Sequence, residues 1–93
     1  MPLEEIENEV EGFVRQHFKV ALDDPRFNRD ADLYEDGYID SVGFAELMTF
    51  LESRFSIELQ DGDIVSDDFS TVAGVSRIVK RLGEAEMGQQ PGP

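Results

Sequence analysis

The sequence predicts an all-α protein, a small four-helix bundle with three main helices and one short helix. Three stretches repeat apolar residues at the spacing of one helix face, and capping residues precede two of them. The chain has 93 residues, of which 40% are hydrophobic, and this is enough for one domain with one modest core. A bundle with a long first connection is therefore the expected architecture.

The first helix is expected over residues 2–22. Its apolar residues form a single stripe: Leu3, Ile6, Val10, Phe13, Val14, Phe18 and Ala21. Pro2 suits the first helical position, and the glutamates that follow it lie near the positive end of the helix dipole. The run Asp23-Asp24-Pro25 should end the helix, because the residue before a proline avoids the α region.

A long connection without helical periodicity follows, over residues 26–39. Phe27, Leu33 and Tyr34 are expected to pin it to the core, since long loops in compact domains are usually packed or functional. Ile39 is expected to pack as the apolar residue just before the next helix cap.

The second helix is expected from Ser41 to about Arg54, with Asp40 as its N-cap. Its core face comprises Phe44, Leu47, Met48, Leu51 and Phe55. Ser41 then becomes the first helical residue. Its hydroxyl lies at the positive end of the dipole, where unpaired amides favour an anion. Gly43 should cost this helix about 1 kcal/mol relative to alanine.

The rest of the chain predicts a short helix near residues 63–67 and a last helix that Ser70-Thr71 caps. Buried candidates before the last helix are Ile57, Leu59, Ile64, Val65 and Phe69. The last helix has an apolar stripe at Val72, Val75, Ile78, Val79 and Leu82. Gly83 is the expected residue just past its end. We therefore expect a domain over residues 1–83 and a flexible tail over residues 84–93.

The charge balance restricts the partners. Asp and Glu number 21 against 8 Lys and Arg, a net charge of −13. Such a surface repels nucleic-acid phosphates and anionic membranes, and it steers the chain towards proteins with basic docking patches. The chain has no cysteine and therefore no thiol of its own, and its only histidine, His17, has no evident place near Ser41. Without a signal peptide or apolar span, a cytoplasmic protein is expected.

The tripeptide Asp40-Ser41-Val42 follows a loop glycine and an apolar pair and precedes the amphipathic helix. This arrangement resembles the acyl/peptidyl carrier protein family over roughly residues 30–82. The resemblance implies an acyl-carrier-protein bundle, with residues 1–83 as the carrier domain. It also implies that Ser41 carries a phosphopantetheine arm from coenzyme A, and that Asp40 completes the motif and caps the helix. The carrier itself catalyses nothing, and its arm tethers biosynthetic intermediates as thioesters.

The resemblance also implies partners. A phosphopantetheinyl transferase would attach the arm, and an adenylating ligase or acyltransferase would load it for downstream tailoring or condensing enzymes. The docking face implied for these enzymes is the outer side of the second helix: Val42, Ala45, Glu46, Thr49 and Glu52. A monomer without a metal site of its own is expected.

Departures from the family pattern leave the pathway open. Gly43 stands where many fatty-acid-type carriers have an acid, and Tyr38-Ile39 replaces the glycines of peptidyl carriers in modular synthetases. We therefore favour nonribosomal peptide or polyketide-type secondary metabolism, such as antibiotic biosynthesis. The alternative is a D-alanyl carrier-like protein. Because phenylalanines crowd the site, we expect short acyl or aminoacyl cargo rather than a long chain.

Two other interpretations compete with a carrier. One is an acidic interaction or calcium-binding module, because part of the connection matches positions 1, 5, 6 and 8 of an EF-hand loop: Asp32, Asp36, Gly37 and Ile39. Gly43 falls at position 12, where a bidentate glutamate is needed, and this weakens the match. The other is that Asp40-Ser41 only caps a helix.

Overall fold

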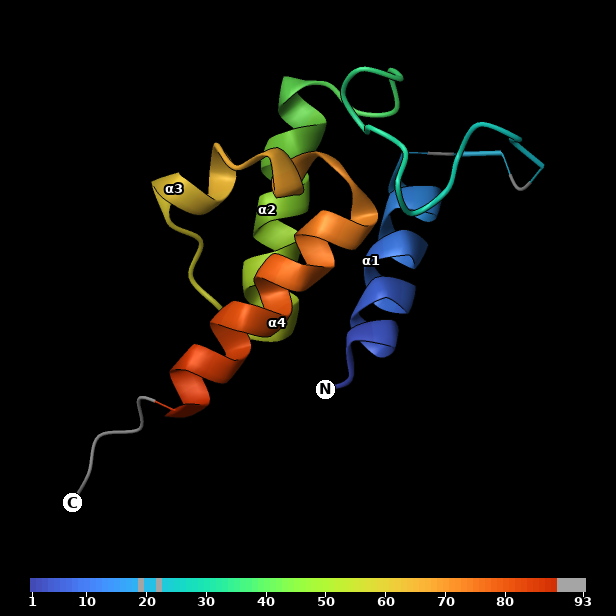
Figure 1. Cartoon of the computed structure of the whole chain (residues 1–93). Coiled ribbons are helices and arrows are strands. Elements are labelled where there is room, and N and C mark those ends of the chain that lie inside the picture. The colour runs from blue at the N-terminus through green and yellow to red at the C-terminus, as the bar shows by residue number, and fades with distance from the viewer. Residues whose placement is uncertain (19, 22, 89–93) are drawn as a thin grey trace.

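The computed structural model describes residues 1–18, 20–21 and 23–88, and every regular element in these ranges is helical (Figure 1). The elements are α1 (Leu3–His17), α2 (Ser41–Phe55), α3 (Asp61–Ile64), the 3-10 turn η1 (Asp67–Ser70) and α4 (Val72–Gly88). The all-α prediction is confirmed. The second helix begins at Ser41 as expected, and it begins at the end of the bundle opposite the N-terminus (Figure 1).

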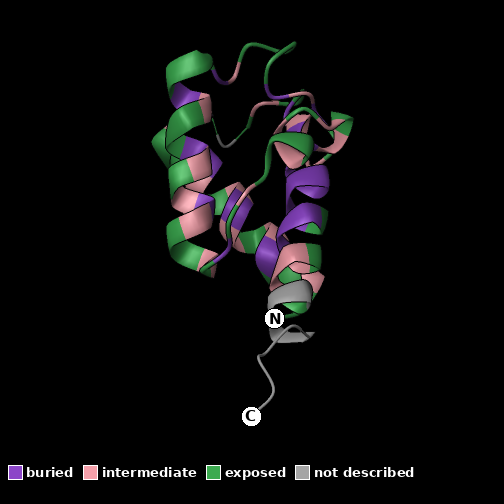
Figure 2. Ribbon diagram, turned by 90° about the vertical axis from the view of Figure 1, so that its left-hand side faces the viewer, coloured by how far each residue is buried: buried purple, intermediate pink, exposed green. Residues whose placement is uncertain are grey.

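The core gathers around α4, which packs against α1 and η1. Figure 2 shows most of the first turns of α4 buried, whereas α1 and α2 bury one face and expose the other. The side chains with the least exposed surface come from all three main helices and from the connection between α1 and α2: Leu33, Leu47, Leu51, Ile78, Val10, Val14, Val72, Val75 and Ser76. The predicted apolar stripes therefore form a single core, except that Ala21, expected on the first stripe, lies beyond the end of α1 and is exposed.

The first helix is shorter than predicted and ends at His17, not at residue 22. The amide of Val20 donates to the carbonyl of Arg15 at 3.0 Å, across the end of the helix. Val20 is itself buried, at 9% exposure. Burial of this valine turns the chain out of the helix before Asp23-Asp24-Pro25 is reached.

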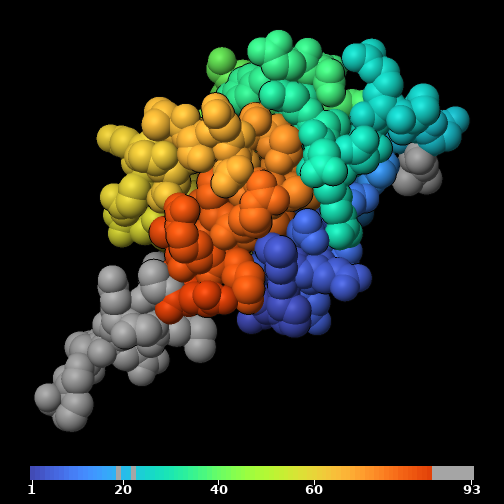
Figure 3. Space-filling view, viewed as in Figure 1, coloured from blue at the N-terminus to red at the C-terminus, as the bar shows by residue number. Residues whose placement is uncertain are grey.

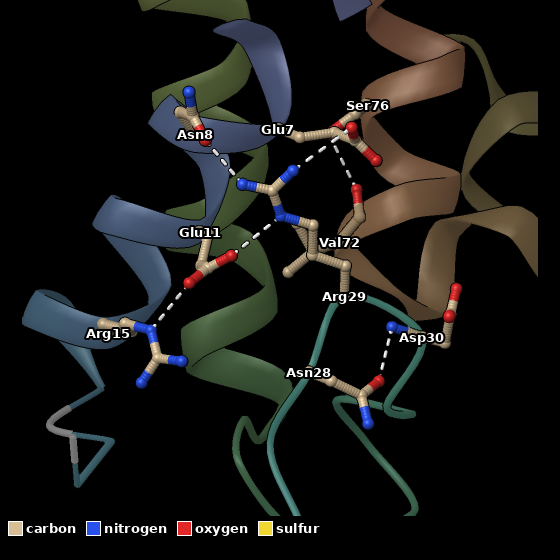
Figure 4. Close-up of polar contacts among 9 residues, drawn as sticks. All are labelled: Glu7, Asn8, Glu11, Arg15, Asn28, Arg29, Asp30, Val72 and Ser76. Atoms are coloured by element: carbon tan, nitrogen blue, oxygen red, sulfur yellow. Dashed lines mark hydrogen bonds and ion pairs between the residues drawn. The ribbon is translucent and has the colours of Figure 1, made fainter. Parts of the chain in front are cut away.

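The connection between α1 and α2 is tied to two helices by Arg29. Its guanidinium Nε donates to Glu11 Oε1 at 2.9 Å and its Nη1 lies 3.3 Å from Glu7 Oε1, while Asn8 accepts a third hydrogen bond (Figure 4). Its backbone carbonyl accepts from the amide of Ala73 at 2.9 Å, at the start of α4. Figure 3 shows the connection, in teal, lying against both α1 and α4.

Two of the three predicted core contacts of this connection are confirmed. Leu33 and Phe27 are buried, but Tyr34 is 40% exposed, so its prediction as a core residue is wrong. The Tyr34 ring instead lies across the ring of Phe44, with 5.2 Å between centroids. A tyrosine ring is stable in such a half-exposed position, because its apolar face packs on the neighbouring ring.

The segment after α2 differs from the prediction in its boundaries. The short helix α3 starts at Asp61, where the amide of Gln60 donates to Asp63 Oδ2 at 3.1 Å, and ends at Ile64. A separate 3-10 turn, η1, follows. Val65, predicted to be in the core, is 80% exposed and lies between these two short elements.

The last helix begins as predicted, with the hydroxyl of Thr71 accepting from the amide of Gly74 at 2.9 Å. Its predicted end at Gly83 is wrong, because α4 runs to Gly88. Gly83 does not adopt a positive φ, and an ion pair between Lys80 and Glu84, at 2.9 Å, bridges the turn that contains it. Residues 84–88 are thus helical, and the remainder of the predicted tail, residues 89–93, lies outside the described residues.

Gly74 is required by the close approach of η1 to α4. A Cβ built on Gly74 would lie 1.9 Å from the backbone oxygen of Asp68. We therefore expect Gly74→Ala to lower the free energy of unfolding by about 1–3 kcal/mol, the usual range for an overpacked contact. Gly12→Ala is the matched control, because a Cβ there meets nothing within 4 Å. It should stabilise α1 by about 0.5–1 kcal/mol. Equal effects of both substitutions in urea denaturation would contradict this account.

Stability should fall in acid through Glu11. Hydrogen bonds from Arg29 and then Arg15 lower the pKa of the Glu11 carboxyl below its usual value of 4.5. Because the folded state lowers this pKa, the contribution is present above the unfolded pKa and is lost as the pH falls through the folded one. Glu11→Gln should therefore cost stability at neutral pH and little well below pH 4.5, measured by urea denaturation. Glu35→Gln, at an exposed loop position, should show no such pH-dependent difference.

Candidate functional site

Ser41 is the first residue of α2 and is exposed to solvent. Asp40 caps the helix as predicted. Its Oδ1 accepts from the amide of Gly43 at 2.8 Å, and its carbonyl accepts from the amide of Phe44 at 2.8 Å. Within the described part of the chain, the amides of Ser41 and Val42 and the Ser41 hydroxyl have no hydrogen-bond partner. These groups are free to bind something that comes from solvent.

The position of Ser41 depends on a set of backbone hydrogen bonds at Leu33. The Leu33 amide donates to the carbonyl of Ser70 at 2.8 Å, and its carbonyl accepts from both Tyr38 and Ile39, at 2.9 and 3.0 Å. Gly37 closes this turn with a φ of 79°, a conformation that favours glycine. Ile39 is buried just before the cap, as expected. The hydrogen bond between Leu33 and Ser70 therefore fixes the start of α2 relative to η1.

Tyr38 anchors the same turn from its other side. Its hydroxyl donates to Asp24 Oδ2 at 3.0 Å, and its ring meets Phe27 edge to face, with 5.1 Å between centroids. The amide of Arg26 is the largest cause that lowers the pKa of the Asp24 carboxyl, and the Tyr38 hydroxyl adds to it. The turn before Ser41 is thus held by polar and apolar contacts together.

Tyr34 lies beside the site, where the sequence analysis did not expect it. Burial raises the pKa of its hydroxyl, and the negative charge of Asp40 raises it further. Because Tyr34 also packs on Phe44, it forms one wall next to the helix start. No sequence signal separates an apolar loop residue that enters the core from one that lies over a neighbouring ring.

Gly43 is buried, and its absence of a side chain has a packing reason. A Cβ at this position would lie 2.6 Å from Cε1 of Phe18, just past the end of α1. Glycine at this position lowers the stability of the helix, but it lets the start of α2 lie close to the end of α1. Helical periodicity does not indicate this contact between Gly43 and Phe18.

Four of the five predicted docking residues line one open groove, of about 810 Å³, on the outer side of α2: Val42, Ala45, Glu46 and Thr49. Two residues farther along α2, Ser53 and Arg54, extend the groove. Its remaining lining comes from Phe13 and His17 of α1 and from Phe50 of α2. The groove starts at the residue next to Ser41.

The α1 side of the groove is the part that the sequence analysis missed. The rings of Phe13 and Phe50 stack, with 4.1 Å between centroids, and His17 stacks on the other side of Phe13 at 4.8 Å. His17 Nε2 also bonds the carboxylate of Glu46, so the histidine lies against the outer face of α2. The i, i+4 spacing of Phe13 and His17 shows that they share a face of α1, but not which helix they meet.

Glu52 is not brought together with the other predicted docking residues. Its Oε2 accepts from the amide of Leu59 at 3.0 Å, and its side chain is half-buried. It therefore fixes the segment that leads from α2 to α3. This backbone contact depends on a loop conformation that helix periodicity does not reveal.

In the segment that resembles an EF-hand loop, the carboxylate of the first acidic residue, Asp32, accepts hydrogen bonds from backbone amides. Asp32 Oδ1 accepts from the amides of Tyr34 and Glu35, at 2.9 and 2.8 Å, as in an Asx turn. Among the described residues, no three acidic, histidine or cysteine side chains are grouped as metal ligands would be. In the same residues, no helix combines the length and the apolar character needed to cross a membrane.

A small helical bundle with an exposed serine at a helix start, whose hydroxyl has no partner among the described residues, is compatible with a protein that carries a covalently attached group. No protein-family profile matches the chain. D-alanyl carrier proteins of Streptococcus pyogenes are similar to it. Those of serotypes M5 (strain Manfredo), M49 (strain NZ131) and M1 are each 33% identical over 67 residues, covering 72% of this chain and 85% of the relative. The chain therefore belongs to the family of carrier proteins that includes the D-alanyl carrier proteins.

The Asp40 cap can be tested apart from any carrier function. Asp40→Ala should lower the free energy of unfolding by about 1 kcal/mol, because the amide of Gly43 loses its acceptor. Asp40→Asn keeps an acceptor oxygen and should cost much less. Urea denaturation measures both, and amide exchange in the first turn of α2 should quicken only in Asp40→Ala. Equal losses in the two variants would mean that charge, and not the cap hydrogen bond, matters at this position.

Proposed function

We propose that this protein is a discrete acyl or aminoacyl carrier with a phosphopantetheine arm on Ser41. The observation that supports this most is the Ser41 hydroxyl, exposed at the first position of α2 and without an intramolecular partner in the described residues. A phosphopantetheinyl transferase would attach the arm from coenzyme A, using Mg²⁺ held mainly by that enzyme.

The residues present fit such a group. Attachment would leave a negatively charged phosphodiester on Ser41, next to the amides of Ser41 and Val42, which have no partner among the described residues. Amides and the dipole at a helix N-terminus stabilise such a charge. Ser41 is itself exposed, and so is its neighbour Val42, at 68%. When bound, the arm supplies a terminal thiol on which cargo is carried as a thioester.

In this proposal the chain does not catalyse a reaction. It supplies the folded surface that partner enzymes recognise. The net charge of −13 speeds the approach of enzymes with basic patches. Val42, Ala45, Glu46 and Thr49 lie together on the outer side of α2 and are the proposed contact points for the transferase, the loading enzyme and later enzymes. Glu52, which holds the Leu59 amide, is a weaker candidate for such contact.

For the pathway we propose nonribosomal peptide or polyketide-type secondary metabolism, with an adenylating ligase or acyltransferase as the loading enzyme. The relatives named D-alanyl carrier protein favour a second candidate, in which the cargo is D-alanine. Loading assays with a D-alanine-activating ligase distinguish the two. Because coenzyme A and ATP would be the donors for attachment and loading, we propose a cytoplasmic protein, acting as a monomer with residues 1–83 as its carrier domain.

Attachment at Ser41 is tested by intact mass. After incubation with coenzyme A, Mg²⁺ and a broad-specificity transferase, the wild type should gain the mass of one phosphopantetheinyl group. Ser41→Ala should gain nothing, whereas Ser53→Ala, at an exposed serine of the same helix, should be modified like the wild type. An unmodified wild type, or a modified Ser41→Ala, would overturn the proposal.

Asp40 could also help the transferase, beyond its capping of α2. Asp40→Asn keeps the acceptor of the cap but removes the negative charge next to Ser41. The same mass assay, followed over time, tests this role. An unchanged rate of modification in Asp40→Asn would restrict Asp40 to capping.

A further inference from the structure

The end of α1 lies against the start of α2, close to Ser41. A Cβ on Gly43 would lie 2.6 Å from Cε1 of Phe18, the residue just after α1. Gly43 follows Ser41 by two residues, which is about 3 Å along the helix axis. The Phe18 ring packs edge to face on Phe13 and His17, with 5.9 and 5.0 Å between centroids. An enzyme that reaches Ser41 from this side therefore meets α1 as well as α2.

The surface that an enzyme covers around Ser41 is wider than one helix. A stable interface ordinarily takes about 800 Å² from each partner, which is a disc of roughly 16 Å radius. A helix with its side chains is only about 10–12 Å across. His17 bonds the carboxylate of Glu46, which lies about 7.5 Å along α2 from Ser41. His17 therefore falls inside the surface that such an interface covers.

The groove between α1 and α2 has the composition of an interface centre. Within residues 41–47 only Glu46 carries a charge, although the chain has a net charge of −13. Phe13 and Phe50, which line the groove, stack with 4.1 Å between centroids, and His17 stacks on Phe13 at 4.8 Å. Interface centres are enriched in aromatic residues and depleted in charged ones, and their rims are polar. The groove therefore favours an apolar contact, and the acidic surface around it favours basic residues at the partner's rim.

The transferase is the partner that must reach Ser41 itself, whereas a loading enzyme meets the far end of the arm. We propose that the transferase docks on α1 and α2 together, with an aliphatic or aromatic side chain in the groove and basic residues around it. Phe13 and His17 supply the α1 side of this contact, and Val42 and Ala45 supply the α2 side. The inference rests on the proposed attachment at Ser41 and deepens it by naming the α1 contacts and the partner's chemistry.

The kinetics of attachment test the α1 contact. The concentration of the chain is varied with coenzyme A, Mg²⁺ and the broad-specificity transferase, and intact mass gives KM and kcat. His17→Ala should raise KM for the chain at least about fivefold, with kcat within about twofold, because docking loses a ring while Ser41 is unchanged. His17→Phe keeps a ring without the bond to Glu46 and should stay within about twofold of the wild type.

Gln16 provides the matched control. It is the exposed neighbour of His17 on α1 and does not line the groove. Gln16→Ala should therefore leave KM within about twofold of the wild type. Urea denaturation of all three variants shows whether the fold is retained. If His17→Ala proves unstable, the resonance experiment on the wild type described below decides alone.

Salt separates an apolar contact from a charged one. Between about 0.1 M and 1 M NaCl the Debye length falls from about 10 Å to about 3 Å, so steering by the net charge weakens for every variant alike. The ratio of the KM of His17→Ala to that of the wild type should stay the same, because contact between apolar groups is not screened. A ratio that falls to one at high salt would assign the effect to a charged contact and would overturn the proposal.

Nuclear magnetic resonance on the unmodified full chain identifies the partner's side chain. With the transferase present and coenzyme A absent, methyl or aromatic protons of the transferase should show nuclear Overhauser contacts to the rings of Phe13 and His17. The ring of Phe27, which is buried beneath the connection, should show none. Contacts from lysine or arginine side chains alone would contradict the apolar chemistry.

Each failure has its own meaning. A wild type that is never modified overturns the proposed attachment. A modified wild type for which His17→Ala and Gln16→Ala have equal KM values overturns only the docking proposal. Overhauser contacts between two copies of the chain in the absence of the transferase would assign the groove to self-association, and would also overturn it.

Discussion

The structure depends on the way in which one buried residue of the connection joins three segments. Leu33 is fully buried, its amide donates to Ser70 at the end of η1, and its carbonyl accepts from the two residues that precede Asp40. A long loop ordinarily has considerable freedom, and its ordering costs conformational entropy. At Leu33 that cost is offset by burial and by backbone hydrogen bonds in a single place. The start of α2 therefore has a defined position relative to α4.

The two faces of α2 have different roles, one in stability and the other in the candidate function. Its inner face packs Leu47 and Leu51 into the core, and its outer face carries Ser41 at one end and the groove beside it. Changes on the outer face should leave the core intact, so function can be tested without loss of the fold. Gly43 marks the exception, because it lies against Phe18 and couples the helix start to α1.

Sequence reasoning succeeded where local chemistry decides. The start of α2, the Asp40 cap and the Thr71 cap depend on short-range hydrogen bonds, and all three are confirmed. It failed where distant segments compete. The first helix ends early because Val20 leaves the helix and is buried in the core. The Tyr34 side chain is not buried in the core, because its ring packs on the ring of Phe44. Glu52 lies outside the groove, where its carboxylate accepts from the amide of Leu59, and its docking role stays a prediction.

The amino-acid sequence alone determined the helical class, the capped start of α2 and the serine displayed there, since periodicity and capping act within a few residues. Only the tertiary structure decided that Phe13 and His17 meet the outer side of α2 and turn a row of exposed residues into a groove. Helical periodicity reveals which residues share a face. Which faces meet is decided by the packing of the whole chain, because close packing selects one arrangement of the helices.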